Sequence, residues 1–305
     1  MTKKVARMAN VSRFRLRSSA FERPEEREQV KAKRCVVLSV EGDDTERDYF
    51  NGLNRHLDSS VITIQVLCHK KGDGYSAPPH VVALLEEYLS ARDGDLIPDE
   101  IRQLFAEYSE ADWNCYLNRP EDLSDEKKEE IRTNLLLKGI DFNYRKFLSD
   151  IGGEDDIFGI IMDRDCGCHT QKQLKRCINH CQKLAQKGRK VGFYISNPCF
   201  EFWLLLHLCD VKLVYTPEQL DKWIKNENGS NNNQGSKQVS KELSEIAHHQ
   251  KDISIDIFDR CYWPNMSIAV KRAGDFATEF PALFNELGTN IPDLLREIPG
   301  TLSEN

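Results

Sequence analysis

Short apolar runs alternate with amphipathic stretches along most of this chain, a pattern typical of α/β proteins built on a parallel sheet. Each apolar run ends at polar or glycine residues, as expected of strands that are covered on both faces. A helical pattern or a loop and helix follow each run, so crossover rules predict a parallel sheet with right-handed connections and helices on both faces. The predicted strands are 35–40, 61–67, 157–165 and 191–196, and the predicted core helices are 44–53, 80–91, 171–188 and 198–207.

Two stretches depart from this alternation. Residues 92–150 are acidic, are broken by Pro98 and Pro120, and predict a helical insertion between the second and third strands. Their charged run at 125–130 predicts a solvated helix face. Residues 225–240 are polar and rich in Gly and Asn, which predicts a flexible loop.

The pattern therefore divides the chain into four parts, and two more helices are predicted in the last of them, at 267–284 and 291–298. The parts are a basic leader 1–34, an α/β core 35–91 and 151–215, the acidic helical insertion 92–150, and a C-terminal helical part 216–305 that contains the loop 225–240.

The length of 305 residues is enough to bury one large core or two smaller ones. No apolar run approaches the ~20 residues that a membrane span needs. The first residues lack the apolar stretch of a secretion signal, so we expect a cytoplasmic protein without membrane contact. The ten cysteines of such a protein are expected to be reduced thiols.

Charge is spread unevenly around a net value of −7. The leader 1–34 holds eleven Lys and Arg residues against four Glu, and Arg13, Arg15 and Arg17 alternate with other residues in it. Two interpretations remain open for this leader, an arm that contacts nucleic acid and a segment that becomes ordered on a partner. The acidity of the rest of the chain does not favour non-specific coating of DNA.

Carboxylates follow two of the predicted strands. Asp163 and Asp165 stand at the exit of the third strand, and Glu41 stands at the exit of the first. Residues two apart in a strand point the same way, so the two aspartates are expected to face one cation, and Glu41 joins them if the strands are neighbours. Such a set suits Mg²⁺ or Mn²⁺, which can orient phosphate and activate water. The alternative is that these acids only mark a solvated strand end.

Other candidates lie near the same predicted edge. Gly42 allows a sharp turn or a close approach to a ligand, and Lys71 lies in a glycine-containing loop where phosphate or only solvent could be bound. Glu201 falls in the first turn of a very apolar helix that Asn197 and Pro198 are expected to open, and a buried acid there needs a metal or a basic partner.

Cysteines and histidines cluster after the two aspartates. Cys166, Cys168, Cys177 and Cys181 could hold structural zinc, but their spacing is not that of a standard zinc ribbon, and packed or exposed thiols are the favoured interpretation. His207 lies on an apolar helix and is expected to be a hydrogen-bonded core histidine.

Three segments together resemble a known family: VVLSVEGDDTERDYFNGL at 36–53, IIMDRD at 160–165 and ISNPCFEFWLLLH at 195–207. They look like the RloB-like proteins, a branch of the Toprim-domain proteins found in bacterial and archaeal defence loci. The resemblance covers roughly residues 33–90 and 155–300, and it leaves the leader and the insertion unexplained.

The resemblance implies a Toprim-like (Rossmann-like) parallel sheet flanked by helices. It implies general acid/base work and a metal contact for Glu41, Mg²⁺ binding by Asp163 and Asp165, and a further site role for Glu201; Lys71 matches a basic loop position only loosely. The implied activity is Mg²⁺- or Mn²⁺-dependent cleavage of DNA or RNA in anti-phage defence, beside an SMC/ABC-type ATPase.

Two alternatives to a nuclease stay open at this stage. One is a non-catalytic docking or regulatory subunit of an ATPase complex, and the other is a transferase that acts on small nucleotides. The sequence also leaves a homo-oligomer open.

Overall fold

The computed structural model describes residues 34–42, 44–67, 77–150, 153, 155–165, 169–186, 188–224, 234–247 and 252–302. The leader up to residue 33 and three predicted site residues, Lys71, Cys166 and Cys168, lie outside the described residues. The described chain forms two compact units, one made of residues 34–85 and 153–302 and the other of residues 86–150.

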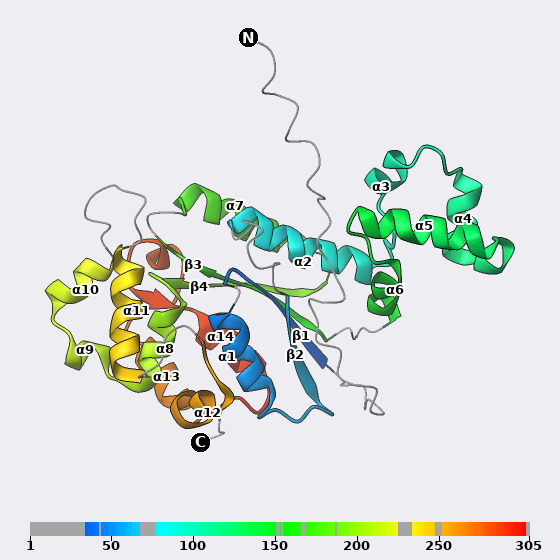
Figure 1. The fold of residues 1–305 in the computed structure, drawn as a ribbon. Helices are drawn as coiled ribbons and strands as arrows, with labels where there is room; N and C mark the ends of the chain where they lie inside the picture. The colour runs from blue at the N-terminus through cyan, green and yellow to red at the C-terminus, as the bar shows by residue number, and fades with distance from the viewer. Residues whose placement is uncertain are drawn as a thin grey trace, which may run out of the picture. The chain divides into compact units, whose positions relative to one another are not determined.

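The larger unit is built on a sheet of five strands in the order β2-β1-β3-β4-β5 (Figure 1). The strands are β1 Arg34–Val40, β2 Ile62–Leu67, β3 Ile157–Asp163, β4 Lys190–Asn197 and β5 Gly288–Thr289. The first four pair in parallel, which confirms the predicted α/β sheet. β5 is antiparallel to β4 and was not predicted, because two residues carry no periodic pattern.

The outer edge of β4 is paired by a side chain as well as by β5. Asn290 accepts a hydrogen bond from the Ile195 backbone N–H at 2.7 Å and donates one to the Phe193 carbonyl at 3.0 Å. The amide of Asn290 therefore continues the ladder of β5 toward the start of β4.

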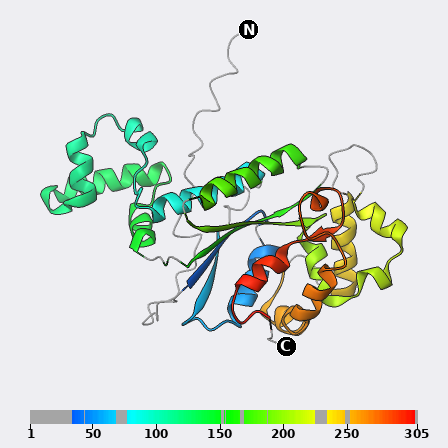
Figure 2. The same cartoon turned by 180° about the vertical axis from the view of Figure 1, so that it is seen from behind.

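Helices cover both faces of this sheet. α7 lies on one face, whereas α1 and α14 lie on the other (Figures 1 and 2). The chain winds from β1 through α1 to β2 in one direction and from β3 through α7 to β4 in the other, so the winding reverses between β1 and β3. The helices with residues in this unit are α1 Thr45–Asn54, α2 Pro78–Arg92 (which continues into the smaller unit), α7 Gln171–Ala185, α8 Phe200–Leu208, α9 Val211–Val214, α10 Pro217–Ile224, α11 Gln234–Ala247, α12 Ile255–Ile257, α13 Met266–Ala273 and α14 Ile291–Glu297.

Hydrophobic packing in the larger unit centres on α8. All but the last of its residues are buried, and its rings meet those of Tyr49 and Tyr262 in edge-on contacts. α8 is therefore the central helix of the core, as its apolar sequence predicts. Within the described part of the chain, no helix has the length and apolar character to span a membrane.

The C-terminal half differs from the sequence prediction in three places. α11 begins at Gln234, so the predicted loop 225–240 is helical over its last residues. Val239 and Leu243 of this helix are buried in the core. The predicted helix 267–284 ends at Ala273, just before Gly274. A helical run precedes it instead, through α12, a π-helical turn at Phe258–Tyr262 and a 3-10 turn at Trp263–Asn265.

The smaller unit is helical and has its own core. Its helices are α3 Asp99–Leu104, α4 Glu110–Asn118, α5 Asp125–Leu137 and α6 Phe142–Asp150, with a 3-10 turn at Pro120–Asp122. Trp113, Ile131 and Ile140 are almost fully buried at its centre. Arg145 is also buried and donates hydrogen bonds to Glu87 at 2.9 Å and to the Asp95 carbonyl at 3.1 Å.

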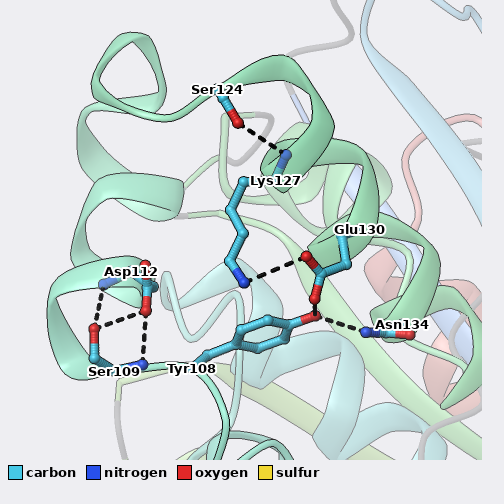
Figure 3. A network of polar contacts seen from close by, with 7 residues as sticks. All are labelled: Tyr108, Ser109, Asp112, Ser124, Lys127, Glu130 and Asn134. Atoms are coloured by element: carbon cyan, nitrogen blue, oxygen red, sulfur yellow. Dashed lines mark hydrogen bonds and ion pairs between the residues drawn. The ribbon is translucent and has the colours of Figure 1, made fainter.

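The predicted solvated face of α5 is present, and its charges alternate in sign. Lys127 pairs with Glu130 at 3.3 Å, and Lys128 pairs with Asp125 at 2.9 Å. Glu130 also accepts a hydrogen bond from the Tyr108 hydroxyl at 2.9 Å, within the polar network that Figure 3 shows. Such (i, i+3) pairs are common on solvated helices and contribute little each.

Candidate active site at the carboxyl edge of the sheet

Glu41 and Asp163 meet at the point where the winding of the sheet reverses. β1 and β3 are neighbours, and the Glu41 backbone N–H extends their ladder by donating to the Ile161 carbonyl at 3.1 Å. The Glu41 carboxylate then accepts a hydrogen bond from the Asp163 backbone N–H at 3.1 Å. The predicted meeting of these two strand ends is confirmed, at the place where open α/β sheets bind their ligands.

The chain turns directly after β3, between Asp163 and Asp165. β3 ends at Asp163, and Asp165 has a φ of 39°, in the left-handed region that few non-glycine residues adopt. The Asp165 N–H donates to the Pro198 carbonyl at 3.0 Å, and the Arg164 N–H donates to the Ser196 carbonyl at 2.8 Å. Because β3 ends at Asp163, strand alternation does not decide where the Asp165 carboxylate lies. Its charge still raises the pKa of both Glu41 and Asp163, so the three acids share this edge.

His169 lies between the two strand ends and has no role in the sequence prediction of this edge. Its Nδ1 is 3.0 Å from the Asp163 carbonyl oxygen, and its Nε2 is 3.3 Å from the second carboxylate oxygen of Glu41. Arg164 fixes the backbone of His169, because its guanidinium donates to the His169 carbonyl at 2.5 Å and to the Phe284 carbonyl at 2.8 Å. Both side chains are buried, so the ring of His169 is held in place against Glu41.

Two more acids approach the same edge from helix first turns. Glu201 lies in the first turn of α8 and Glu46 in that of α1, and both are buried. Asp163 receives a hydrogen bond from the Phe200 N–H at 2.8 Å, which ties it to the start of α8. The sequence prediction included Glu201 but missed Glu46, although Glu46 falls within one of the segments that carry the family resemblance.

The carboxylates of this edge disfavour one another's charge. Burial raises the pKa of Glu41 above its usual range, the Asp163 N–H lowers it, and the charges of Glu46 and Asp165 raise it. Burial also raises the pKa of Asp163, and the charges of Glu41, Glu46, Glu201 and Asp165 add to the effect. Clusters of acids with raised pKa values are typical of sites that bind a cation or transfer a proton.

The donor chemistry of this edge fits a hard divalent cation. Carboxylate oxygens are the ligands that Mg²⁺ and Mn²⁺ prefer, and a cation would relieve the repulsion that raises both pKa values. Over the described ranges, no three His, Cys, Asp or Glu side chains are arranged so that they could hold a metal ion by themselves. Mg²⁺ is usually held by one or two carboxylates and completed by water and substrate phosphate, so the edge suits a cation that arrives with a phosphate.

The remaining site predictions have different outcomes. Gly42 does not have a left-handed backbone. A Cβ at this position would overlap a carboxylate oxygen of Glu46, so the glycine makes room for that acid. Cys177 and Cys181 lie on the packed side of α7, where burial raises the pKa of their thiols to about 11 and about 12. Zinc binding needs thiolates, which these values disfavour, and the other two cysteines of that prediction lie outside the described residues.

Two sequence predictions concern α8, one about His207 and one about where the helix begins. His207 is the hydrogen-bonded core histidine that was expected, with contacts to the Trp203 carbonyl at 3.0 Å and the Tyr49 hydroxyl at 3.3 Å. The predicted helix start at Asn197 and Pro198 is wrong by two residues. The helix begins at Phe200 and is preceded by Cys199, while Asn197 still belongs to β4.

Comparison with known proteins gives one match. A family model described as RloB-like protein matches residues 36–298. The match contains Glu41, Asp163, Asp165 and Glu201, and also His169 and Glu46. No match to the chain was found among curated proteins or among solved structures.

Proposed function

The chain belongs to the RloB-like family, and on this premise we propose that it is a Mg²⁺-dependent nuclease that cleaves phosphodiester bonds in DNA or RNA. The observation that carries the proposal is the contact between the Glu41 carboxylate and the Asp163 backbone at the point where the winding reverses, with three more acids around it. A largely buried, mutually repelling group of acids at this position is suited to a phosphate that brings a divalent cation.

Asp163 and Asp165 would hold the cation, with Glu41 and Glu201 beside them. When bound, Mg²⁺ or Mn²⁺ would supply Lewis acidity to the phosphate and lower the pKa of bound water. The hydrogen bond from the Phe200 N–H fixes one oxygen of Asp163, which leaves the other oxygen of that carboxylate for a ligand.

Glu41 is suited to moving the proton. Its raised pKa lets it keep a proton at a higher pH than an ordinary glutamic acid, and His169 and the Asp163 N–H fix the direction of its two oxygens. Water adds to phosphorus and the bond to the leaving oxygen breaks. The leaving oxygen takes the Glu41 proton, and the proton that the water releases returns to Glu41.

The experiment is a cleavage assay with the full-length chain, Mg²⁺ and separate DNA and RNA substrates. Glu41→Gln keeps the shape of the side chain and removes its proton chemistry, so it should abolish cleavage, as should EDTA. Glu297→Gln is the matched control, because Glu297 is an exposed acid on α14 outside the site. Cleavage that persists in both Glu41→Gln and EDTA would refute the proposal.

A second candidate function is a non-catalytic docking subunit. It is favoured by one observation, that no three metal-binding side chains are arranged around a cation among the residues with described positions. Calorimetry separates the two, because a nuclease site should take up Mg²⁺ or Mn²⁺ at millimolar concentration and lose this uptake in Asp163→Asn. The resemblance to proteins of defence loci extends either proposal to anti-phage defence beside an SMC/ABC-type ATPase.

A further inference from the structure

α7 carries exposed cations and no acidic residues. The stretch from residue 166 to residue 200 holds seven Lys and Arg residues and no Asp or Glu, within a chain whose net charge is −7. Four of the seven lie on α7 and are exposed: Lys172, Lys175, Arg176 and Lys183. We refer to these four residues as the basic stripe.

The basic stripe occupies a single side of the helix. At about 100° per residue, its four positions fall within an arc of about 100°. The buried residues of α7 are Leu174, Cys177, Cys181 and Leu184, and they fall on the opposite side, against the sheet. The packing of α7 therefore turns all four cations outward together.

The contrast with α5 shows that this charge is not balanced locally. On α5 each cation has an acid three residues away, as Lys127 has Glu130 (Figure 3). Throughout the described ranges, none of the four cations of the basic stripe forms an ion pair. Lys175 lies 5.6 Å from the centre of the Phe284 ring, a contact that keeps its charge exposed.

The basic stripe begins at the carboxylate edge. α7 starts two residues after His169, which contacts Glu41, and its first residue, Gln171, donates to Asn285 at 2.6 Å. From Lys172 to Lys183 the stripe runs about 16 Å at about 1.5 Å per residue. One strand of a nucleic acid duplex carries a phosphate about every 3.4 Å of its axis, so the stripe is as long as about five phosphates.

We propose that the basic stripe of α7 binds the phosphate backbone of a nucleic acid and leads it to the carboxylate edge. Four unpaired cations in a row neutralise a repeating polyanion, whereas a small nucleotide would meet only one or two of them. The delivery to the edge rests on the proposed nuclease function, but the binding does not. The substrate class is therefore a polymer, and the contacts are with its backbone rather than with its bases.

The test measures binding of the full-length chain to a fluorescein-labelled 20-base-pair DNA duplex and to an RNA strand of equal length, by anisotropy in EDTA. The variant Lys172→Gln/Lys175→Gln/Arg176→Gln/Lys183→Gln removes the basic stripe. The matched control removes four exposed lysines of α10, α11 and α13, as Lys222→Gln/Lys237→Gln/Lys241→Gln/Lys271→Gln. Circular dichroism establishes that both variants are folded.

Each phosphate contact contributes about −0.9 to the slope of log affinity against log salt on duplex DNA. Wild type should therefore lose about a hundredfold more affinity between 50 and 200 mM salt than the stripe variant, and the control should behave as wild type. No binding by wild type at 50 mM salt, an unchanged slope in the stripe variant, or an equal loss in the control would overturn the inference. Binding measured in EDTA needs neither the cation nor cleavage, so a failure of the nuclease proposal alone leaves this result standing.

Discussion

His207 provides a quantitative test of the packing that positions the carboxylate edge. It lies on α8, the helix that also carries Glu201, and it is surrounded by the rings of Tyr49, Trp203 and Tyr262. Burial lowers the pKa of its imidazole from 6.5 to about 3. The folded protein therefore keeps His207 neutral in a pH range in which the unfolded chain protonates it.

The size of the effect follows from proton linkage. Between pH 6.5 and about 3 the unfolded state binds a proton at His207 that the folded state does not bind, so stability falls as the pH falls. Each pH unit in this range is worth about 1.4 kcal/mol. From pH 7 to pH 4.5, His207 alone should remove about 2.5 kcal/mol from the free energy of unfolding.

The assay is urea unfolding of wild type and His207→Gln at pH 7 and at pH 4.5. The difference between the two proteins should change by about 2.5 kcal/mol between the two pH values, because the other titrating groups cancel. Tyr49→Phe is the control, since it removes the hydroxyl that contacts Nε2 but leaves the buried imidazole, and it should keep the wild-type pH dependence. An equal pH dependence in wild type and His207→Gln would refute the reasoning.

Three further outcomes are expected. Asp163→Asn removes a largely buried charge that its neighbours repel, so it should raise the midpoint of urea unfolding at pH 7. This gain should shrink as the pH falls and wild-type Asp163 takes up its proton, and a lower midpoint at pH 7 would contradict the reasoning. Arg145→Met leaves Glu87 buried without its cation and should lower the free energy of unfolding by about 3–5 kcal/mol in the same assay. Adding Glu87→Gln to this variant should restore part of the loss, and a further loss in the double variant would count against the ion pair. Gly42→Ala should displace the Glu46 carboxylate and slow cleavage about a hundredfold, with little change in the unfolding midpoint. If this variant cleaves at the wild-type rate, Glu46 has no role in the site.

The parts of the site that follow a local rule could be predicted from the sequence. Four strands were found because each is a continuous apolar run, and Glu41 and Asp163 were found because carboxyl ends of parallel strands meet at one edge. The turn at Asp165 could not be predicted, because the end of β3 is decided by hydrogen bonds with Ser196 and Pro198, which lie more than thirty residues away.

His169 and Glu46 could not have been assigned by periodicity. His169 sits in a Cys/His cluster that suggested zinc, and its contact with Glu41 joins segments that are distant in the sequence. Glu46 resembled any acid in a helix first turn, where it would favour the helix dipole on an exposed face. Only its burial against the edge distinguishes it. The basic stripe does not stand out in the sequence, because the leader 1–34 holds more Lys and Arg residues than residues 166–200 do.

The pairing of β4 with β5 and Asn290 has a consequence for self-association. An edge strand with free backbone groups invites a strand from another molecule, which can lead to aggregation. Here the amide of Asn290 occupies the groups of Phe193 and Ile195 that an incoming strand would use. Removal of the chain from Gly288 onward would thus leave β4 as an unpaired edge strand. Copies of the protein would then be expected to pair along this strand into extended sheets.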